Sequence, residues 1–537
     1  MHLLRATAAL LLVLGCGGGG GKGAGAPALD IEAKDGGADV ASPPADLGSP
    51  IDVPLAEDAS VDDVTSTDAP EPIDTSEPTD IPELADLAAP DVSPADTAGP
   101  PPLFDMPAIV DAATAQCSFT DPHTAFKDGV LLDVWKLSYI SWESIDGVLQ
   151  PILIRGFAAR PSTSVEPMPG VVQAHGLGGY AEESHATGTA ALLGAFVIAY
   201  TGPGGGTEPD NTSEGLPAGA SDGYRLFDTL KDPRGSWFWG HAVAGMRGIT
   251  CLVTRPEVDA SRLGMTGFSA GGVVTLMASG VDSRIAAAVP LSGTGAWGVA
   301  TQSPAAWQHA LLTKAGLSIA SPEWTTLLST IGADVLVAGA SAKILMVNGS
   351  TDEFFPLTAH LATFIAIPGT DARTSIAANF DHGCYKLTGV ESAADIEARA
   401  ELHAKGGQRM WFGHWFGTDP DYAVLPATPV ATVAPIGPGS FITAVVDTSP
   451  PKLEVEEVRV WWSGDDSFIY GSVTLDPAGG GVWSKLTGIP IAPNTITFVD
   501  VQYKTQALLF PERFTLSSLP AVPAGLVPHI RGIDSCL

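Results

Sequence analysis

Short apolar runs alternate with helical patterns through the middle of the chain. Residues 170–174, 195–200, 263–268, 285–291, 343–348 and 373–378 are short continuous or near-continuous apolar segments, and segments 182–193, 241–254 and 271–279 have helical patterns. Strand-like segments 134–142 and 148–159 flank Asp146-Gly147, a typical two-residue hairpin turn. Apolar strands separated by helices predict a mostly parallel sheet that is covered on both faces. We expect an α/β domain over residues 117–425, with two antiparallel and about six parallel strands, eight in all.

The pattern changes after about residue 426. Short alternating strands are predicted at 441–446, 455–462, 468–475, 482–489, 495–504 and 513–517, with turn residues at 464–466 and 477–481. This pattern predicts a small β-sandwich over residues 427–537. Its tryptophans Trp461, Trp462 and Trp483 fit core packing better than a carbohydrate-binding face. As an alternative to binding carbohydrate, this domain would cover one edge of the preceding α/β sheet.

Neither pattern occurs in the first hundred residues. No Phe, Trp or Tyr precedes Phe104, and fourteen prolines lie between Pro27 and Pro102. Residues 1–105 hold 20 acidic and three basic residues, which give −17 of the total charge of −33. A segment without aromatic residues cannot bury enough apolar surface to offset its ordering entropy. We expect residues 17–107 to be a disordered, extended linker. The excess of acidic over basic residues argues against a nucleic-acid partner, because contacts to phosphates need a basic surface.

The first sixteen residues have the features of an export signal. One basic residue, Arg5, precedes the apolar run 8–14, and Leu14-Gly15 stands before Cys16. This junction resembles a bacterial lipobox, which implies cleavage before Cys16 and a lipid anchor on that residue. The apolar run is too short to span a bilayer. The resemblance implies a cell-envelope protein held by a lipid bilayer, with Gly17 pointing to the outer membrane. The alternative is an ordinary signal peptide, an incidental cysteine and an extracellular protein.

Four further cysteines lie in the remainder of the chain: Cys117, Cys251, Cys384 and Cys536. An exported protein encounters oxidising conditions, so disulfides are possible. Cys117 and Cys536 stand at the two ends of the predicted folded region, where one bridge would clamp the termini together. Four cysteines can form two disulfides in three different ways, and the sequence does not choose among them. The alternative is that all four remain free thiols.

The sequence GFSAG at residues 267–271 lies between a predicted strand and a predicted small-residue helix. A Gly-x-Ser-x-Gly turn in that context is typical of a nucleophile elbow, which lifts the serine hydroxyl out of the sheet. The alternative is a glycine-rich strand–helix junction. We interpret Ser269 as a nucleophile.

A serine hydroxyl needs a neighbouring base, which in turn is oriented by an acid. Asp352 follows strand 343–348, and His382 follows strand 373–378, in the order nucleophile, acid, base. Glu353 competes with Asp352 for the role of the acid. The remaining downstream candidates, His360, His403 and His414, lie on predicted helices and are better explained by surface or packing positions.

The transition state of acyl transfer needs donors for its oxyanion. His175-Gly176-Leu177-Gly178-Gly179 follows strand 170–174 directly. We expect the N–H groups of Leu177 and Ala270 to form the oxyanion hole, with His175 holding the loop. A plain glycine turn is the alternative.

These segments together resemble an α/β-hydrolase. The segments on which this resemblance rests are PGVVQAHGLGG, GMRGITCLVTRPEVDASRLGMTGFSAGG, NGSTDEFFP and NFDHG. They are nearest to the acetyl xylan esterase, dienelactone hydrolase and prolyl oligopeptidase type of catalytic domain. The resemblance implies Ser269 as nucleophile, His382 as base and Asp352 as orienting acid. The serine disfavours dienelactone hydrolase activity, and the absence of a propeller-sized segment disfavours a prolyl oligopeptidase.

The sequence therefore favours a serine-dependent carboxylesterase or carbohydrate acetylesterase that acts on a small-molecule or carbohydrate ester. The alternatives are a peptidase or amidase with the same three residues, and a non-catalytic glycan-binding surface protein. No metal-ligand spacing or phosphate loop occurs, so no cofactor is expected. Two insertions, 202–240 and 296–338, contain tryptophans that fit either substrate-pocket walls or ordinary packing. These are Trp237, Trp239, Trp297, Trp307 and Trp324.

Overall fold

The computed structural model describes residues 103–163, 167–218, 225–227, 232–382, 391–464, 469–507, 511–523 and 526–527. The export signal, Cys16, the linker up to residue 102, Cys384 and Cys536 lie outside the described residues. Within these ranges no helix combines the length and the apolar character needed to cross a bilayer.

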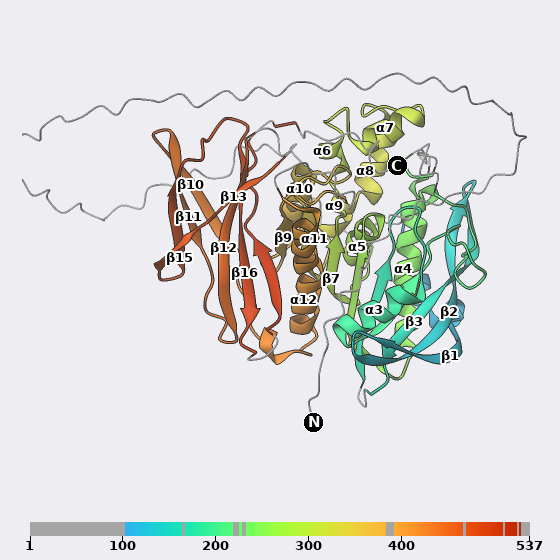
Figure 1. The fold of residues 1–537 in the computed structure, drawn as a ribbon. Helices are drawn as coiled ribbons and strands as arrows, with labels where there is room; N and C mark the ends of the chain where they lie inside the picture. The colour runs from blue at the N-terminus through green and yellow to red at the C-terminus, as the bar shows by residue number, and fades with distance from the viewer. Residues whose placement is uncertain are drawn as a thin grey trace, which may run out of the picture. The chain divides into compact units, whose positions relative to one another are not determined.

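The first folded part is built around one nine-stranded sheet with the strand order β1-β2-β3-β5-β4-β6-β7-β8-β9. Figure 1 shows β1, β2 and β3 on the side of this part away from β9. The strands are β1 Ser118–Lys127, β2 Val130–Ile145, β3 Val148–Pro161, β4 Met168–Ala174, β5 Phe196–Tyr200, β6 Val258–Phe268, β7 Ile285–Leu291, β8 Lys343–Gly349 and β9 Arg373–Ala377. Strands β1 to β3 are antiparallel to their neighbours, whereas the six from β5 to β9 in the sheet are parallel. The expected fold class, an α/β-hydrolase sheet followed by a small all-β domain, is confirmed.

The sheet has one strand more than expected, because β1 was not predicted. This strand contains Asp121 and Pro122, and most of its residues are exposed or half-buried. It lies at the edge of the sheet, where proline is tolerated and no apolar face is required. The hairpin between β2 and β3 follows the prediction. Asp146 and Gly147 have φ angles of 52° and 76°, which is the left-handed conformation that a tight two-residue hairpin turn requires.

Helices cover both faces of this sheet. They are α1 Met106–Ile109, α2 Ala112–Ala115, α3 Glu183–Leu193, α4 Trp237–Val253, α5 Ala270–Val281, α6 Trp297–Ala300, α7 Trp307–Lys314, α8 Pro322–Ile331, α9 Ala333–Val337, α10 Leu357–Ala366, α11 Ala393–Glu401 and α12 Gly407–Trp415. Met246 of α4 and Val274 of α5 are buried in one apolar cluster, together with side chains on one face of the sheet. Ala190 of α3 and Phe412 of α12 bury in a second cluster. The two clusters are the two layers of core on either side of the sheet.

The chain segment before β1 packs along α4. The buried Arg247 of α4 donates hydrogen bonds to the carbonyls of Ala108, Ile109 and Asp111, at 2.9 to 3.2 Å. A disulfide joins Cys117 to Cys251 at the end of the same helix, with Cα atoms 5.5 Å apart. Of the pairings that the sequence left open, the structure has Cys117 with Cys251 and not with Cys536. The segment before β1 runs back along α4, which brings Cys117 to Cys251.

The C-terminal part consists of two four-stranded antiparallel sheets, with the orders β10-β11-β15-β14 and β13-β12-β16-β17. Its strands are β10 Val430–Ile436, β11 Gly439–Val445, β12 Leu453–Ser463, β13 Gly471–Thr474, β14 Asp476–Gly479, β15 Val482–Thr487, β16 Ile496–Thr505 and β17 Arg513–Ser517. Strands β10 and β14 were not predicted, because β10 is largely exposed and β14 occupies part of the predicted turn at 477–481. Ile442, Val460 and Val499 fill the apolar layer between the sheets.

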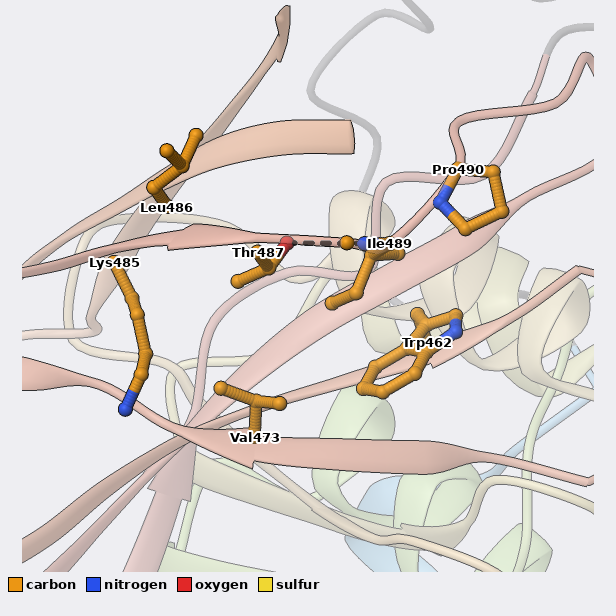
Figure 2. A pocket seen from close by; sticks show the side chains of 8 residues that line it. Trp462, Val473, Lys485, Leu486, Thr487, Ile489 and Pro490 are labelled. Atoms are coloured by element: carbon orange, nitrogen blue, oxygen red, sulfur yellow. Dashed lines mark hydrogen bonds between the residues drawn. The ribbon is translucent and has the colours of Figure 1, made fainter. Parts of the chain in front are cut away.

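The three tryptophans of this part have different environments. Trp461 is buried, and its indole N–H donates to Asp500 at 2.9 Å. Trp483 is half-buried. Trp462 lines an open, mostly apolar groove of about 250 Å³ (Figure 2). The other lining residues are Val473, Lys485, Leu486, Thr487, Gly488, Ile489 and Pro490. Trp461 is thus a core residue, as the sequence favoured, and the groove contains none of the predicted site residues.

Candidate functional site

Ser269 lies in a sharp turn between β6 and α5. Its φ and ψ angles are 60° and −123°, a conformation that a non-glycine residue rarely adopts. The flanking glycines are required by close backbone contacts. A Cβ atom at Gly267 would lie 2.6 Å from the backbone of Gly271, and one at Gly271 would lie 2.3 Å from the carbonyl oxygen of Ala174. The strand–turn–helix geometry expected of a nucleophile elbow is therefore present.

The three residues singled out from the sequence lie in one hydrogen-bonded chain. The His382 Nε2 atom is 2.8 Å from the Ser269 Oγ atom. On the other side of the ring, the His382 Nδ1 atom is 2.9 Å from the Asp352 Oδ2 atom. Asp352 and His382 are buried, with 3% and 6% of their surface exposed. Residues from three separate strand ends, β6, β8 and β9, thus meet at the carboxyl edge of the sheet.

The carboxylate of Asp352 is held in place by its own loop. Its Oδ1 atom accepts hydrogen bonds from the backbone N–H groups of Phe354 and Phe355, at 3.0 and 2.8 Å. The Oδ2 atom is thereby directed at the histidine ring. This arrangement fixes which imidazole nitrogen carries the proton, since Nδ1 must donate to the carboxylate and Nε2 is left facing the serine hydroxyl.

Glu353, the competing acid, occupies a different position. Its Oε2 atom accepts the backbone N–H of His382 at 3.0 Å, so it contacts the main chain of the histidine rather than the ring. Burial, together with the charges of Asp352 and Asp381, raises the pKa of Glu353 to about 7. Of the two adjacent carboxyl groups, the structure therefore places Asp352 at the ring.

The ring of His382 lies among aromatic side chains. Its centroid is 4.6 Å from that of Phe354, 5.0 Å from Phe268 and 5.6 Å from Phe355. Burial by itself would lower the pKa of His382. The charge and hydrogen bond of Asp352, with the nearby acidic groups, outweigh burial and raise the pKa above the ordinary imidazole value. The site thus stabilises an imidazolium when the ring accepts a proton.

The turn after β4 approaches the serine closely. A Cβ atom at Gly176 would lie 3.1 Å from the Ser269 Cβ atom, so a larger residue there would require Ser269 to shift. Among the described residues, neither the N–H of Leu177 nor that of Ala270 donates a hydrogen bond. Ala270 is the first residue of α5, so its N–H carries part of the positive end of the helix dipole. Gly176, which precedes Leu177, and Ala270, which follows Ser269, thus both adjoin the serine.

The half-buried His175 and the buried His241 hold this turn in place, and sequence reasoning recognised only the first. The Nε2 atom of His175 accepts the Gly202 N–H at 2.8 Å, and its Nδ1 atom lies 2.6 Å from the Gly176 carbonyl oxygen. The Nε2 atom of His241, on α4, lies 3.3 Å from the His175 carbonyl oxygen. Burial lowers the pKa of His175 to about 4 and that of His241 well below its ordinary range, so both are neutral. No local signal identified His241, because its role depends on how α4 packs against the turn.

The tryptophans of the two insertions are buried. They have between 1% and 4% of their surface exposed and include Trp237, Trp239, Trp297, Trp307 and Trp324. The rings of Trp297, Trp307 and Trp324 pack edge-on against Phe227 at 5.3 to 5.7 Å between centroids. Of the two interpretations drawn from the sequence, packing therefore applies to these side chains. Trp307 also contacts Phe354 and so supports the aromatic wall beside His382.

The remaining histidines singled out in the sequence do not reach Ser269. His360 on α10 and His403 are buried, and His414 on α12 is half-buried. Each contacts a neighbouring polar group: Thr374, Ser375 and the carbonyl of Tyr422, respectively. Within the part of the chain that the structure describes, no three His, Cys, Asp or Glu residues are grouped so that they could hold a metal ion.

Comparison with known proteins agrees with this geometry. The model of the acetyl xylan esterase (AXE1) family matches residues 139–293, which is less than a third of the chain and contains the Gly176 turn and Ser269. No curated protein matches the chain. Over the segment that contains the Gly176 turn and Ser269, the chain is therefore similar to the acetyl xylan esterase family, and this similarity supports a hydrolase.

Solved structures of similar proteins include acetyl xylan esterases. The enzyme from Paenibacillus sp. is 20% identical, with a TM-score of 0.42, and the match covers 54% of this chain and 91% of that one. Acetyl xylan esterase 1 from Thermoanaerobacterium sp. is 17% identical, with a TM-score of 0.43, and the match covers 57% of this chain and 96% of that one. An S-formylglutathione hydrolase from Agrobacterium tumefaciens is 18% identical, with a TM-score of 0.35, and the match covers 56% of this chain and all of that one.

Proposed function

We propose that the protein is a serine esterase that cleaves carboxylic esters, with carbohydrate acetyl esters as the substrate class, through a covalent acyl-enzyme. The observation that carries the proposal is the hydrogen-bonded chain from Ser269 through His382 to Asp352. A serine with a histidine base at 2.8 Å is poised for nucleophilic attack. The match to the acetyl xylan esterase family supports the choice of an ester substrate.

In the first step, the Ser269 hydroxyl oxygen attacks the ester carbonyl carbon while its proton moves to the His382 Nε2 atom. The developing imidazolium is stabilised by the Asp352 carboxylate, which holds the Nδ1–H. Negative charge accumulates on the former carbonyl oxygen. The N–H groups of Leu177 and Ala270, together with the N-terminus of α5, are the donors that would stabilise it.

The tetrahedral intermediate then collapses. The bond to the alcohol oxygen breaks, and His382 returns the Nε2 proton to that oxygen, which releases the alcohol and leaves the acyl group on Ser269. In the second half of the reaction, His382 takes a proton from water as the water attacks the acyl-enzyme. Release of the carboxylic acid and return of the proton to Ser269 Oγ regenerate the free enzyme.

The proposal is tested with the purified protein, p-nitrophenyl acetate and butyrate, an acetylated xylo-oligosaccharide and an aminoacyl p-nitroanilide. We expect turnover of the esters, release of acetate from the oligosaccharide, and covalent labelling of Ser269 by a fluorophosphonate probe. Heat-denatured protein is the control, because labelling requires an activated serine. Labelling with faster turnover of the anilide would assign the same residues to an amidase. Absence of both labelling and turnover would overturn the proposal.

The proposal includes a lipid anchor at Cys16, supported by the lipobox-like junction of the leader. In a bacterial host with a lipoprotein pathway, the wild-type chain is expected in the membrane pellet and to incorporate radiolabelled palmitate. Cys16→Ser is expected to lose the label and to move to the soluble fraction, because one residue carries the whole anchor. Retention of the variant in the pellet after a salt wash would contradict the anchor.

A further inference from the structure

The outer edge of the large sheet is occupied by the C-terminal domain. Strand β9 is the last strand of that sheet, and an open edge would leave unpaired N–H and C=O groups. The Ile376 N–H donates to the Ser517 Oγ atom at 2.7 Å, and the Ser375 hydroxyl donates to the Thr515 carbonyl at 2.7 Å. In each of these two bonds, a serine hydroxyl of one strand pairs with a backbone group of the facing strand. Strand β17 thus covers the edge without becoming a tenth strand.

A buried polar network fixes this contact in one register. The Asp500 carboxylate accepts the Ser517 hydroxyl at 2.6 Å and the Trp461 indole N–H at 2.9 Å. The His403 Nδ1 atom, in the π-helical turn Leu402–Gly406 before α12, lies 2.7 Å from the Ser375 hydroxyl oxygen. Satisfied buried polar groups are costly to displace, because a shifted register would leave them without partners.

The contact continues from β9 into the loop that carries His382. Asn379 lies three residues before His382 and is 2% exposed. Its Oδ1 atom accepts the Tyr470 N–H at 2.7 Å, and its Nδ2 group donates to the Tyr470 carbonyl at 2.9 Å. One asparagine side chain therefore pairs with both backbone groups of a residue 91 positions away, in the C-terminal domain.

The backbone of the same residue is constrained as well. Asn379 has a φ angle of 60°, in the left-handed region, and its N–H donates to the Ser350 hydroxyl at 2.9 Å. The neighbouring Phe380 carbonyl accepts the N–H and hydroxyl of Thr351. Asn379 thus links the loop of His382, the loop of Asp352 and the C-terminal domain.

We propose that the C-terminal β-domain is a working part of the active site, and that Asn379 is the positioning residue through which it holds the His382 loop in register with Ser269. This inference rests on the proposed esterase function. A small displacement of the ring would break the 2.8 Å contact with the serine oxygen, and misplacement by about 1 Å costs on the order of 10²-fold in rate.

The test uses the full chain with Asn379→Gly, which keeps the left-handed backbone accessible. The substitution removes both bonds to Tyr470 and also the bond that Nδ2 donates to Glu391 at 2.7 Å. We expect kcat for p-nitrophenyl acetate to fall by about 10- to 100-fold with KM within about twofold, because orientation and not substrate binding is lost. The rate of fluorophosphonate labelling is expected to fall in parallel. Hydrogen exchange of the peptide spanning residues 377–382 is expected to accelerate.

The matched control is Glu512→Ala, at the other end of β17. Glu512 forms an ion pair with Arg409 at 3.3 Å and accepts the Tyr422 hydroxyl at 3.0 Å, so its loss weakens the same interface away from the His382 loop. We expect a lower thermal midpoint with kcat and the exchange of residues 377–382 unchanged. If Asn379→Gly does not fold, Ser517→Ala removes the acceptor of the Ile376 N–H from the other side, and we expect a several-fold lower kcat.

The outcomes separate this inference from the proposed function. If the probe labels the wild-type chain and labels Asn379→Gly at the same rate, the positioning role of Asn379 is overturned. The esterase proposal is unaffected by that result. An equal fall in kcat for Glu512→Ala would also overturn it, since any weakening of the interface would then suffice. A wild-type chain without labelling or turnover would overturn the esterase, and unchanged exchange in Asn379→Gly would still overturn the role of Asn379 in holding the loop.

Discussion

Replacement of Ser269 by alanine is expected to lower kcat for p-nitrophenyl acetate by about 10⁵- to 10⁶-fold, the scale on which a serine hydrolase loses activity without its nucleophile. The alanine methyl group cannot form the acyl-enzyme. The proposed oxyanion donors at Leu177 and Ala270 are not changed by the substitution, so a small residual rate over water is expected to persist. Initial rates at high protein concentration measure the residual, and active-site titration of the wild type gives the reference.

The fold is expected to survive this change, because the substitution removes one hydroxyl group with its hydrogen bond to His382 and leaves the backbone before α5 as it is. Equal thermal midpoints for the wild type and Ser269→Ala would exclude unfolding as the cause of the loss. The fluorophosphonate probe is expected to label the wild type and to leave the variant unlabelled. Turnover of the ester by the variant at the wild-type rate would show that another group is the nucleophile.

Asp352→Asn is expected to have the second largest effect, a fall in kcat of about 10⁴-fold. The wild-type carboxylate accepts the His382 Nδ1–H and leaves Nε2 as the acceptor for the serine proton. An asparagine amide can donate to Nδ1 instead, which shifts the ring proton to Nε2 and removes the base. The site would retain its shape, because the Oδ1 position still accepts the N–H groups of Phe354 and Phe355.

The same substitution also changes the pH profile. The base is active when His382 is neutral, so kcat/KM rises with pH through the pKa of the ring. In the wild type the acidic groups raise that pKa above the ordinary imidazole value of 6.5, which places the midpoint of the acid limb above pH 6.5. Loss of the Asp352 charge lowers the pKa, so the midpoint of the residual activity is expected at lower pH. A midpoint that moves to higher pH would contradict this assignment.

Glu353→Gln is the matched control for Asp352. A glutamine amide oxygen can still accept the backbone N–H of His382, and the ring contact is untouched. We expect kcat to fall by less than about tenfold, because the glutamine keeps the hydrogen bond to the His382 backbone while the charge of Glu353 is removed. A larger effect for Glu353→Gln than for Asp352→Asn would reverse the roles of the two acids.

Local sequence signals predicted the sheet and the position of its loops. Apolar runs and glycines act over a few residues, so strands β4 to β9 and the turn around Ser269 could be located without knowledge of distant contacts. Strand β1 lacked such a signal, because it lies at the sheet edge and its side chains are largely exposed. The pairing of Cys117 with Cys251 was likewise hidden, since it depends on the path of residues 103–116 along α4.

By itself, the sequence determined the fold class, the order of Ser269, Asp352 and His382, and their places after strand ends, because chain order and short-range patterning carry that information. The tertiary structure decided which of two adjacent acids faces the ring and that the insertion tryptophans are buried. It also brought Tyr470 of the C-terminal domain to Asn379 beside the catalytic loop. These features depend on side-chain direction and on contacts between residues tens to more than a hundred positions apart, which no local pattern encodes.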